Sequence, residues 1–201
     1  MLFQEEKTGR DQFAGKVALV TGSSSGIGRG TAEILGLRGA TVLVTGRNVG
    51  EIENTVSTIR EAGGTAYGAP MDIAKREEIE EFFQTFVAPH GLDILVANAG
   101  VSVGGPFLDN TPEDFKKLID TDLLGTVYCI QQAARMMRAQ GRGGSIVTVT
   151  SVNAYYCYPP SIFYSGIKAA LECITRGLAV ELAKDRIRVN CVALLLNLQK
   201  K

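Results

Sequence analysis

The 201-residue sequence has no tryptophan, one histidine, six prolines and four cysteines, which are Cys129, Cys157, Cys173 and Cys191. The cysteines lie far apart with no CxxC pair, so neither a zinc site nor a disulfide framework is predicted, and reduced, mostly buried thiols are expected. Basic and acidic residues balance at 21 each, which gives no indication of a nucleic-acid or anionic-membrane surface. No window approaches the roughly 20 apolar residues of a membrane span. Residues 1–16 carry charges throughout and do not resemble a signal peptide, so a cytoplasmic protein is expected.

The remaining composition is that of an ordinary soluble domain, with 45% hydrophobic and 21% charged residues. The length suits one well-buried domain rather than two. We expect a flexible N-terminal arm over residues 1–13 and a single dinucleotide-binding and catalytic domain over residues 14–201. The 23 glycines are dispersed along the chain, and they indicate turns between many short elements.

Apolar, β-branched runs alternate with segments of helical periodicity. The pattern predicts strands at 16–21, 41–45, 65–71, 93–97, 145–150 and 187–193, and helices at 27–38, 51–62, 75–87, 113–139 and 161–184. Thr111 is placed to cap the fourth helix, and Pro112 suits its first position. Such alternation predicts a doubly wound (Rossmann-type) α/β fold with three α/β/α layers. Its six-stranded sheet is expected to be mostly or all parallel, in the order 3-2-1-4-5-6.

The turn between the first strand and the first helix is rich in glycine and serine. Glycines there permit close approach of a pyrophosphate, and the helix N-terminus supplies free N–H groups and partial positive charge. The alternative is a glycine-rich turn that binds nothing. The predicted cofactor-binding residues are Gly22, Ser23, Ser24, Ser25, Gly26, Ile27 and Gly28.

Three ordered motifs resemble those of the classical short-chain dehydrogenases/reductases. The turn Thr21–Gly28 is similar to the family's TGxxxGxG fingerprint, Asn98-Ala99-Gly100 to its NAG motif, and Tyr164–Lys168 to its YxxxK motif. Ser151 stands thirteen residues before Tyr164, where the family keeps its catalytic serine. The resemblance runs from about Phe13 to Ala193. It implies an oxidoreductase that uses a nicotinamide cofactor on a small carbonyl or alcohol substrate.

The end of the second strand bears on which nicotinamide cofactor is used. An acidic residue there would bind the 2′-hydroxyl of NAD, but the sequence offers Arg47, which suits a 2′-phosphate. NADP(H) is therefore favoured over NAD(H), the alternative for Arg47 being an exposed loop arginine. Asp72 matches a family position that contacts the adenine, or it is an ordinary strand-end aspartate.

A carbonyl–alcohol interconversion also needs a group that moves a proton to or from the oxygen. A free tyrosine, with a pKa of about 10, is a poor base near neutral pH, but a nearby ammonium favours the phenolate. Tyr164 and Lys168 are four residues apart and lie on one helix face. The resemblance implies that Lys168 also holds the nicotinamide ribose and that Ser151 binds the substrate oxygen. The alternative is a surface tyrosine and lysine on an amphipathic helix.

The chain departs from the family pattern at two places. Asp122 stands at the position where the family normally has the asparagine of a proton relay. Three consequences are open: the relay works differently, Asp122 is protonated, or activity is reduced. After Ala193 the family continues with a substrate lid, a helix and a seventh strand, whereas this sequence ends with Leu194–Lys201. The sixth strand is then expected to form an edge, which the terminal lysines protect from association.

Further features leave alternatives open. The aromatic residues Tyr155, Tyr156 and Tyr158 either line a substrate pocket or pack their loop against the sheet, and His90 is expected in a turn. By resemblance, a homodimer forms through the helices 113–139 and 161–184. The rival to the enzyme hypothesis is a catalytically weak or inactive dinucleotide-binding protein. A third hypothesis is a shortened chain that folds poorly alone.

Overall fold

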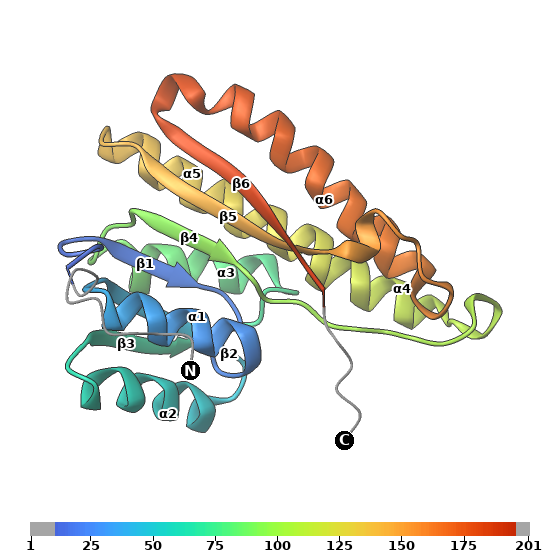
Figure 1. Cartoon of the computed structure of the whole chain (residues 1–201), viewed down its shortest axis with the longest axis horizontal. Coiled ribbons are helices and arrows are strands. Elements are labelled where there is room, and N and C mark those ends of the chain that lie inside the picture. The colour runs from blue at the N-terminus through green and yellow to red at the C-terminus, as the bar shows by residue number, and fades with distance from the viewer. Residues whose placement is uncertain (1–10, 196–201) are drawn as a thin grey trace, which may run out of the picture.

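The computed structural model describes residues 11–195, which form one six-stranded sheet flanked by helices (Figure 1). All neighbouring strands are parallel, in the order β3-β2-β1-β4-β5-β6, so the predicted fold and strand order are confirmed. The strands are β1 (Val17–Val20), β2 (Thr41–Gly46), β3 (Thr65–Pro70), β4 (Ile94–Ala97), β5 (Gly144–Ser151) and β6 (Ile187–Leu194).

Within residues 11–195, six α-helices connect the strands. They are α1 (Gly26–Leu37), α2 (Val49–Glu61), α3 (Arg76–Phe82), α4 (Pro112–Leu118), α5 (Thr126–Gln140) and α6 (Ile162–Glu181). Two π-helical segments, Phe83–Val87 and Ile119–Gly125, continue α3 and join α4 to α5. Short 3₁₀ turns lie at Phe107–Asp109, Val152–Ala154, Pro159–Ser161 and Ala183–Asp185.

Each face of the sheet has its own hydrophobic core. On one face Leu19, Leu95 and Ile146 pack with residues of α3, α5 and the chain beyond α6. On the other face, Val20 and Val44 pack with apolar residues of α1 and α2. Successive strand residues point to opposite faces, so both faces bury side chains only when helices cover both. The sheet thereby becomes a rigid platform whose carboxyl-terminal ends carry the functional loops.

The prediction of one continuous helix over 113–139 is wrong in one respect. The start is confirmed, because the Thr111 hydroxyl accepts a hydrogen bond from Asp114 N and the Asp114 carboxylate accepts one from Thr111 N. The helix then widens into the π-helical segment Ile119–Gly125 before α5 begins. A Cβ atom on Gly125 would lie 2.3 Å from the carbonyl oxygen of Ile73, in the loop after β3. The Gly125 backbone is therefore too close to this loop for a side chain to fit.

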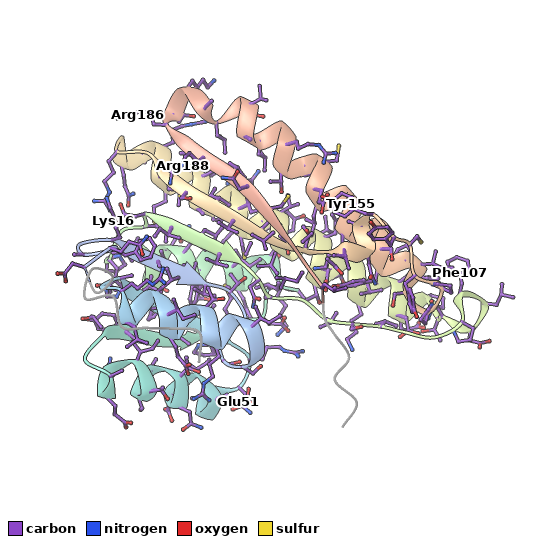
Figure 2. All side chains as sticks on the ribbon, viewed as in Figure 1. Lys16, Glu51, Phe107, Tyr155, Arg186 and Arg188 are labelled. Carbon is purple, nitrogen blue, oxygen red and sulfur yellow. The ribbon has the colours of Figure 1, made fainter. Side chains whose placement is uncertain are left out.

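Within residues 11–195, α1 and α2 leave part of one face of the sheet uncovered, at β5 and β6. Val147, Val149 and Val192 line a groove of about 790 Å³ there, together with residues of α1. Lys16, Arg186 and Arg188 stand at the amino-terminal end of this face (Figure 2). β6 pairs only with β5 in this part of the chain and forms an edge, as predicted. Lys200 and Lys201, expected to protect that edge, lie outside the described residues.

The prediction that most thiols are buried is wrong. Cys129 is buried, whereas Cys157 and Cys173 are exposed and Cys191 is partly exposed. Cys157 lies in an exposed loop and Cys173 on the outer face of α6, positions that a count of apolar residues does not reveal. Burial raises the pKa of the Cys129 thiol to about 12. None of the helices described in the structure is long and apolar enough to cross a membrane.

Candidate active site

A cavity of about 390 Å³ lies at the carboxyl-terminal ends of the strands. Residues from each of the three family-like motifs line it, together with the predicted serine and Asp122. The predicted residues among its lining are Gly22, Ser24, Ser25, Ile27, Arg47, Asp72, Asn98, Ala99, Gly100, Asp122, Ser151, Tyr164 and Lys168. Gly46, Met71, Ile73, Val101, Ser102 and Thr121 line it too, and sequence patterns alone did not single them out.

The glycine turn is held by close backbone packing. Gly22 and Gly26 adopt positive φ angles of 64° and 54°, which side chains disfavour. A Cβ atom on Gly28 would lie 2.2 Å from the Gly22 carbonyl oxygen and 2.4 Å from Asn98 Nδ2. The Ser25 side chain makes no capping hydrogen bond at the start of α1, so the helix N-terminus keeps open N–H groups. The turn therefore offers the backbone donors that phosphate oxygens require.

Not every predicted turn residue reaches the cavity. Ser23 is fully buried, and its hydroxyl donates to the Val20 carbonyl at 2.7 Å and accepts from Thr45 N at 3.0 Å. It ties β1 to β2 and does not line the cavity. Gly26 and Gly28 also stay outside the lining and act through the shape of the turn.

Thr21 and Asn98 join the glycine turn to the end of β4. The Thr21 hydroxyl accepts hydrogen bonds from Asn98 N and Ala99 N, each at 3.0 Å. Asn98 Nδ2 donates to the carbonyl oxygens of Thr21 at 2.9 Å and Gly22 at 3.2 Å. The side chain of Asn98 therefore fixes the turn rather than reaching freely into the cavity.

Arg47 and Asp72 stand at one end of the cavity, after β2 and β3. Arg47 is exposed, and its guanidinium forms no ion pair within residues 11–195. The Asp72 carboxylate accepts from Ala74 N at 3.0 Å, and Asp72 N donates to Glu78 at 2.9 Å. Lys75 and this backbone donor lower the pKa of Glu78. The loop after β3 is thus held in place while Arg47 remains available to an anion.

Tyr164, Lys168 and Ser151 converge at the other end. Tyr164 and Lys168 lie one turn apart on α6, and the Lys168 Nζ atom is 5.2 Å from the Tyr164 ring centre. Ser151 ends β5, and its Oγ accepts a hydrogen bond from Asn153 N at 3.2 Å. That contact uses a lone pair of the hydroxyl and leaves its proton to be donated into the cavity.

Asp122 completes this cluster through a direct ion pair with Lys168. Its Oδ2 atom is 2.9 Å from Lys168 Nζ, and both side chains are buried. The contact lacks the angle of a directed hydrogen bond, and Oδ2 has no other polar partner among residues 11–195. Oδ1 accepts from Val101 N at 2.7 Å. Gly100 makes room for the carboxylate, since a Cβ there would lie 2.8 Å from Oδ2.

Glu172 is a buried acid that sequence analysis missed. It lies one turn beyond Lys168 on α6, and its carboxylate accepts a hydrogen bond from the Thr150 hydroxyl at 3.0 Å. A hydrogen bond to Glu172 raises the pKa of Tyr155. The four-residue spacing of Tyr164, Lys168 and Glu172 was the signal that could have identified it.

The aromatic loop matches neither predicted alternative. Tyr155, Tyr156 and Tyr158 are between 61% and 75% exposed and do not line the cavity. Tyr155 and Phe107 lie on the opposite side of the molecule from Lys16 and Arg186 (Figure 2). His90 lies in a turn, as predicted, and its ring packs against Tyr67 at 4.5 Å between centroids. The described residues contain no group of three or more His, Cys, Asp or Glu side chains that could hold a metal ion.

Comparison with known proteins agrees with this geometry. The short chain dehydrogenase family model matches residues 16–196. Dehydrogenase/reductase SDR family member 4 of Sus scrofa is 38% identical over 186 residues, which cover 92% of this chain and 66% of that protein. The human protein of the same name is also 38% identical, with 92% and 67% covered.

Solved structures give the same result at the level of the backbone. A short-chain type dehydrogenase/reductase from Mycobacterium marinum is 34% identical with a TM-score of 0.85, covering 92% of this chain and 76% of that one. Acetoin dehydrogenase from Enterobacter cloacae is 37% identical with a TM-score of 0.80, covering 89% and 74%. This chain spans about two thirds of the length of the curated relatives named above. The chain belongs to the short-chain dehydrogenase family.

Proposed function

We propose that this chain is an NADP(H)-dependent oxidoreductase that interconverts a ketone or aldehyde and the corresponding alcohol. The observation that carries the proposal is the single cavity in which the glycine turn, Arg47, Ser151, Tyr164 and Lys168 meet. A phosphate-binding turn at one end and a proton-transfer pair at the other are the two parts that such a reaction needs.

The residues present fit a dinucleotide. Gly22 and Gly46 border the cavity. A Cβ atom on Gly22 would lie 2.8 Å from Ala99 Cα, and one on Gly46 would lie 2.6 Å from Ser24 Oγ. Side chains at these two positions would therefore distort the cofactor turn. The start of α1 would hold the pyrophosphate, and Arg47 would pair with a 2′-phosphate. Asp72 is suited to the adenine end, and Lys168 to the nicotinamide ribose. When bound, the nicotinamide supplies or accepts the hydride.

The chain's own residues would orient the substrate and move the proton. Ser151 donates its hydroxyl hydrogen to the substrate oxygen, since the hydrogen bond from Asn153 N uses only a lone pair of Oγ and leaves the proton free. Tyr164 gives a proton to that oxygen during reduction and takes it back during oxidation. Lys168 lies one helical turn from Tyr164, with its ammonium nitrogen 5.2 Å from the Tyr164 ring centre. Asp122 stands where the family normally has the relay asparagine, and its carboxylate contacts Lys168 directly.

The alternative function is that of a catalytically weak or inactive dinucleotide-binding protein. The Asp122–Lys168 ion pair favours it, since the carboxylate competes with other partners for the ammonium. The glycine turn serves both functions equally. Only an assay of turnover distinguishes the oxidoreductase from the non-catalytic protein.

The experiment is a fluorescence titration with NADPH and NADH, followed by NADPH-oxidation assays over a panel of carbonyl compounds. We expect tighter NADPH binding and turnover on at least one carbonyl, with activity lost in Tyr164→Phe while NADPH binding remains. Binding without turnover on any carbonyl would support the non-catalytic alternative. Failure to bind either nucleotide would contradict both functions.

A homodimer through α4, α5 and α6, and a cytoplasmic location, remain predictions. Leu124 beside α5 and Val180 on α6 are exposed apolar side chains that such an interface would cover. Sedimentation equilibrium would test the assembly. A monomer at all micromolar concentrations would contradict it.

A further inference from the structure

Glu172 is a buried acid of α6 that the proposed mechanism does not use. It is 3% exposed and stays outside the lining of the cavity. Among residues 11–195, no lysine or arginine lies within ion-pairing distance of its carboxylate. A buried carboxylate without a neighbouring cation depends on hydrogen-bond donors to replace its hydration. The donors that meet Glu172 therefore identify the part of the chain that it holds.

These donors come from the two sides of Ser151. The Thr150 hydroxyl, directly before Ser151, donates to the Glu172 carboxylate at 3.0 Å in a buried contact. Tyr155, four residues after Ser151, hydrogen-bonds to Glu172, which raises the pKa of Tyr155. Thr150 and Ser151 both line the cavity. Glu172 thus joins α6 to the segment that carries the proposed substrate-binding hydroxyl.

A second polar contact sets the same helix against the same strand. The Thr175 hydroxyl of α6 donates to the Thr148 hydroxyl of β5 at 3.2 Å, and both residues are buried. From this contact to the Glu172 contact, the chain advances two residues on β5 and goes back three on α6. One further helical turn back leads to Lys168, beside the end of β5. The Glu172 contact is therefore the nearer of the two to the proposed catalytic groups.

The turn after Ser151 is shaped by bonds within itself. Asn153 N donates to Ser151 Oγ at 3.2 Å, and Tyr155 N donates to the Val152 carbonyl oxygen at 2.9 Å. These bonds are local, so they define the shape of the turn but do not attach it to α6. Glu172 supplies that attachment through a side chain of the helix.

We propose that Glu172 is a positioning residue, which holds Ser151 and the turn after it against the helix that carries Tyr164 and Lys168. The inference rests on the proposed function. Ser151 and Tyr164 must both reach one substrate oxygen, so a shift of β5 against α6 separates the two donors. A misplacement of about 1 Å costs up to about 100-fold in rate. Loss of the Glu172 carboxylate slows reduction and oxidation alike, because the reaction equilibrium is unchanged, and it leaves the cofactor turn intact.

The kinetic test compares Glu172→Gln with Glu172→Met. Glutamine keeps an oxygen that accepts from the two hydroxyls, whereas methionine keeps the length of the side chain without a comparable acceptor. We expect kcat to fall by about 10- to 100-fold in Glu172→Met and to be largely retained in Glu172→Gln. NADPH affinity, measured by fluorescence, should equal that of the parent in both. Equal kcat in the two variants would overturn the proposal, and so would a parallel loss of NADPH affinity.

Thr150→Val and Thr175→Val form a matched pair that does not depend on the folding of Glu172→Met. Each removes one buried hydroxyl from the contact between β5 and α6 with little change of shape. Thr150→Val takes a donor from Glu172 and should lower kcat, whereas Thr175→Val should leave kcat near the parental value. An equal effect of the two substitutions would show that general packing matters and not the Glu172 contact, which would overturn the proposal.

Hydrogen exchange provides a readout that needs no turnover. In the protein without nucleotide or substrate, the amides of residues 152–156 should exchange about tenfold faster in Glu172→Met and at the parental rate in Glu172→Gln. Exchange over residues 17–28 should not change. Parental exchange over residues 152–156 in Glu172→Met would overturn the proposal. Faster exchange there in a protein that turns over no carbonyl would contradict the proposed function while leaving the attachment by Glu172 standing.

Discussion

The Asp122 carboxylate lies 2.9 Å from the Lys168 ammonium, with both groups buried between α6 and the π-helical segment Ile119–Gly125. A buried ion pair offsets the loss of hydration of its two members only while both are present. Removal of one member leaves the other charged and unpaired in a buried position. The pair therefore matters to stability as well as to chemistry.

Lys168→Met should lower the free energy of unfolding by about 3–5 kcal/mol, because it leaves the Asp122 charge unpaired. The double variant Asp122→Asn, Lys168→Met should lose less than Lys168→Met alone, since no charge remains and Val101 N keeps an acceptor. Urea unfolding at pH 7 is measured for the parent protein, the two single variants and the double variant. Losses that simply add would show that the two side chains are not coupled.

Gly28→Ala should disrupt the cofactor turn, because the new Cβ would lie 2.2 Å from the Gly22 carbonyl oxygen. We expect NADPH affinity to fall by at least about tenfold, since each 1.4 kcal/mol of distortion costs that factor. The control is Gly30→Ala, two residues along α1, where nothing lies within 4 Å of an added Cβ. Alanine there should stabilise the helix by about 0.5–1 kcal/mol and leave binding unchanged. Equal NADPH affinity in the two variants would contradict the packing argument.

Arg47→Ala should weaken NADPH binding by about 10- to 100-fold, the value of a charge-assisted contact of about 1.5–3 kcal/mol. NADH, which has no 2′-phosphate, should bind as before. Arg188→Ala, at the opposite edge of the sheet, serves as the charge-matched control (Figure 2). Isothermal titration calorimetry measures all three proteins. A parallel loss of both nucleotides in Arg47→Ala would show that Arg47 does not select between them.

Thiol alkylation should follow burial rather than sequence position. Cys129 is buried with its pKa raised to about 12, so its thiolate is roughly one part in ten thousand at pH 8. Cys157 and Cys173 are exposed and should react first with iodoacetamide, and Cys191, whose pKa is raised by burial, should follow more slowly. Peptide mass spectrometry over time gives the order. Early modification of Cys129 in the folded protein would contradict the described core.

The strands and the cofactor turn were accessible from sequence because each depends on local patterns. Apolar β-branched runs indicate buried parallel strands, and the glycine spacing indicates a turn with no room for side chains. The π-helical segment was not predicted, because local periodicity does not reveal that Gly125 lies against Ile73, a contact between distant parts of the chain. Ser23 was predicted to bind the cofactor because it lies in the glycine-rich turn. Its hydrogen bonds to Val20 and Thr45 follow from the folded structure and not from the sequence pattern. The Asp122–Lys168 contact is long-range in the same way: the sequence revealed the substitution but not its partner.

Hydride transfer itself gives the most direct test of the proposed function. The protein is incubated with NADPH deuterated at the transferring position of the nicotinamide and with a panel of ketones and aldehydes, and the alcohols are analysed by mass spectrometry. We predict one deuterium on the former carbonyl carbon of at least one product, absent when Tyr164→Phe replaces the parent protein. NADPH binding accompanied by no deuterated alcohol from any carbonyl would contradict the proposed oxidoreductase function.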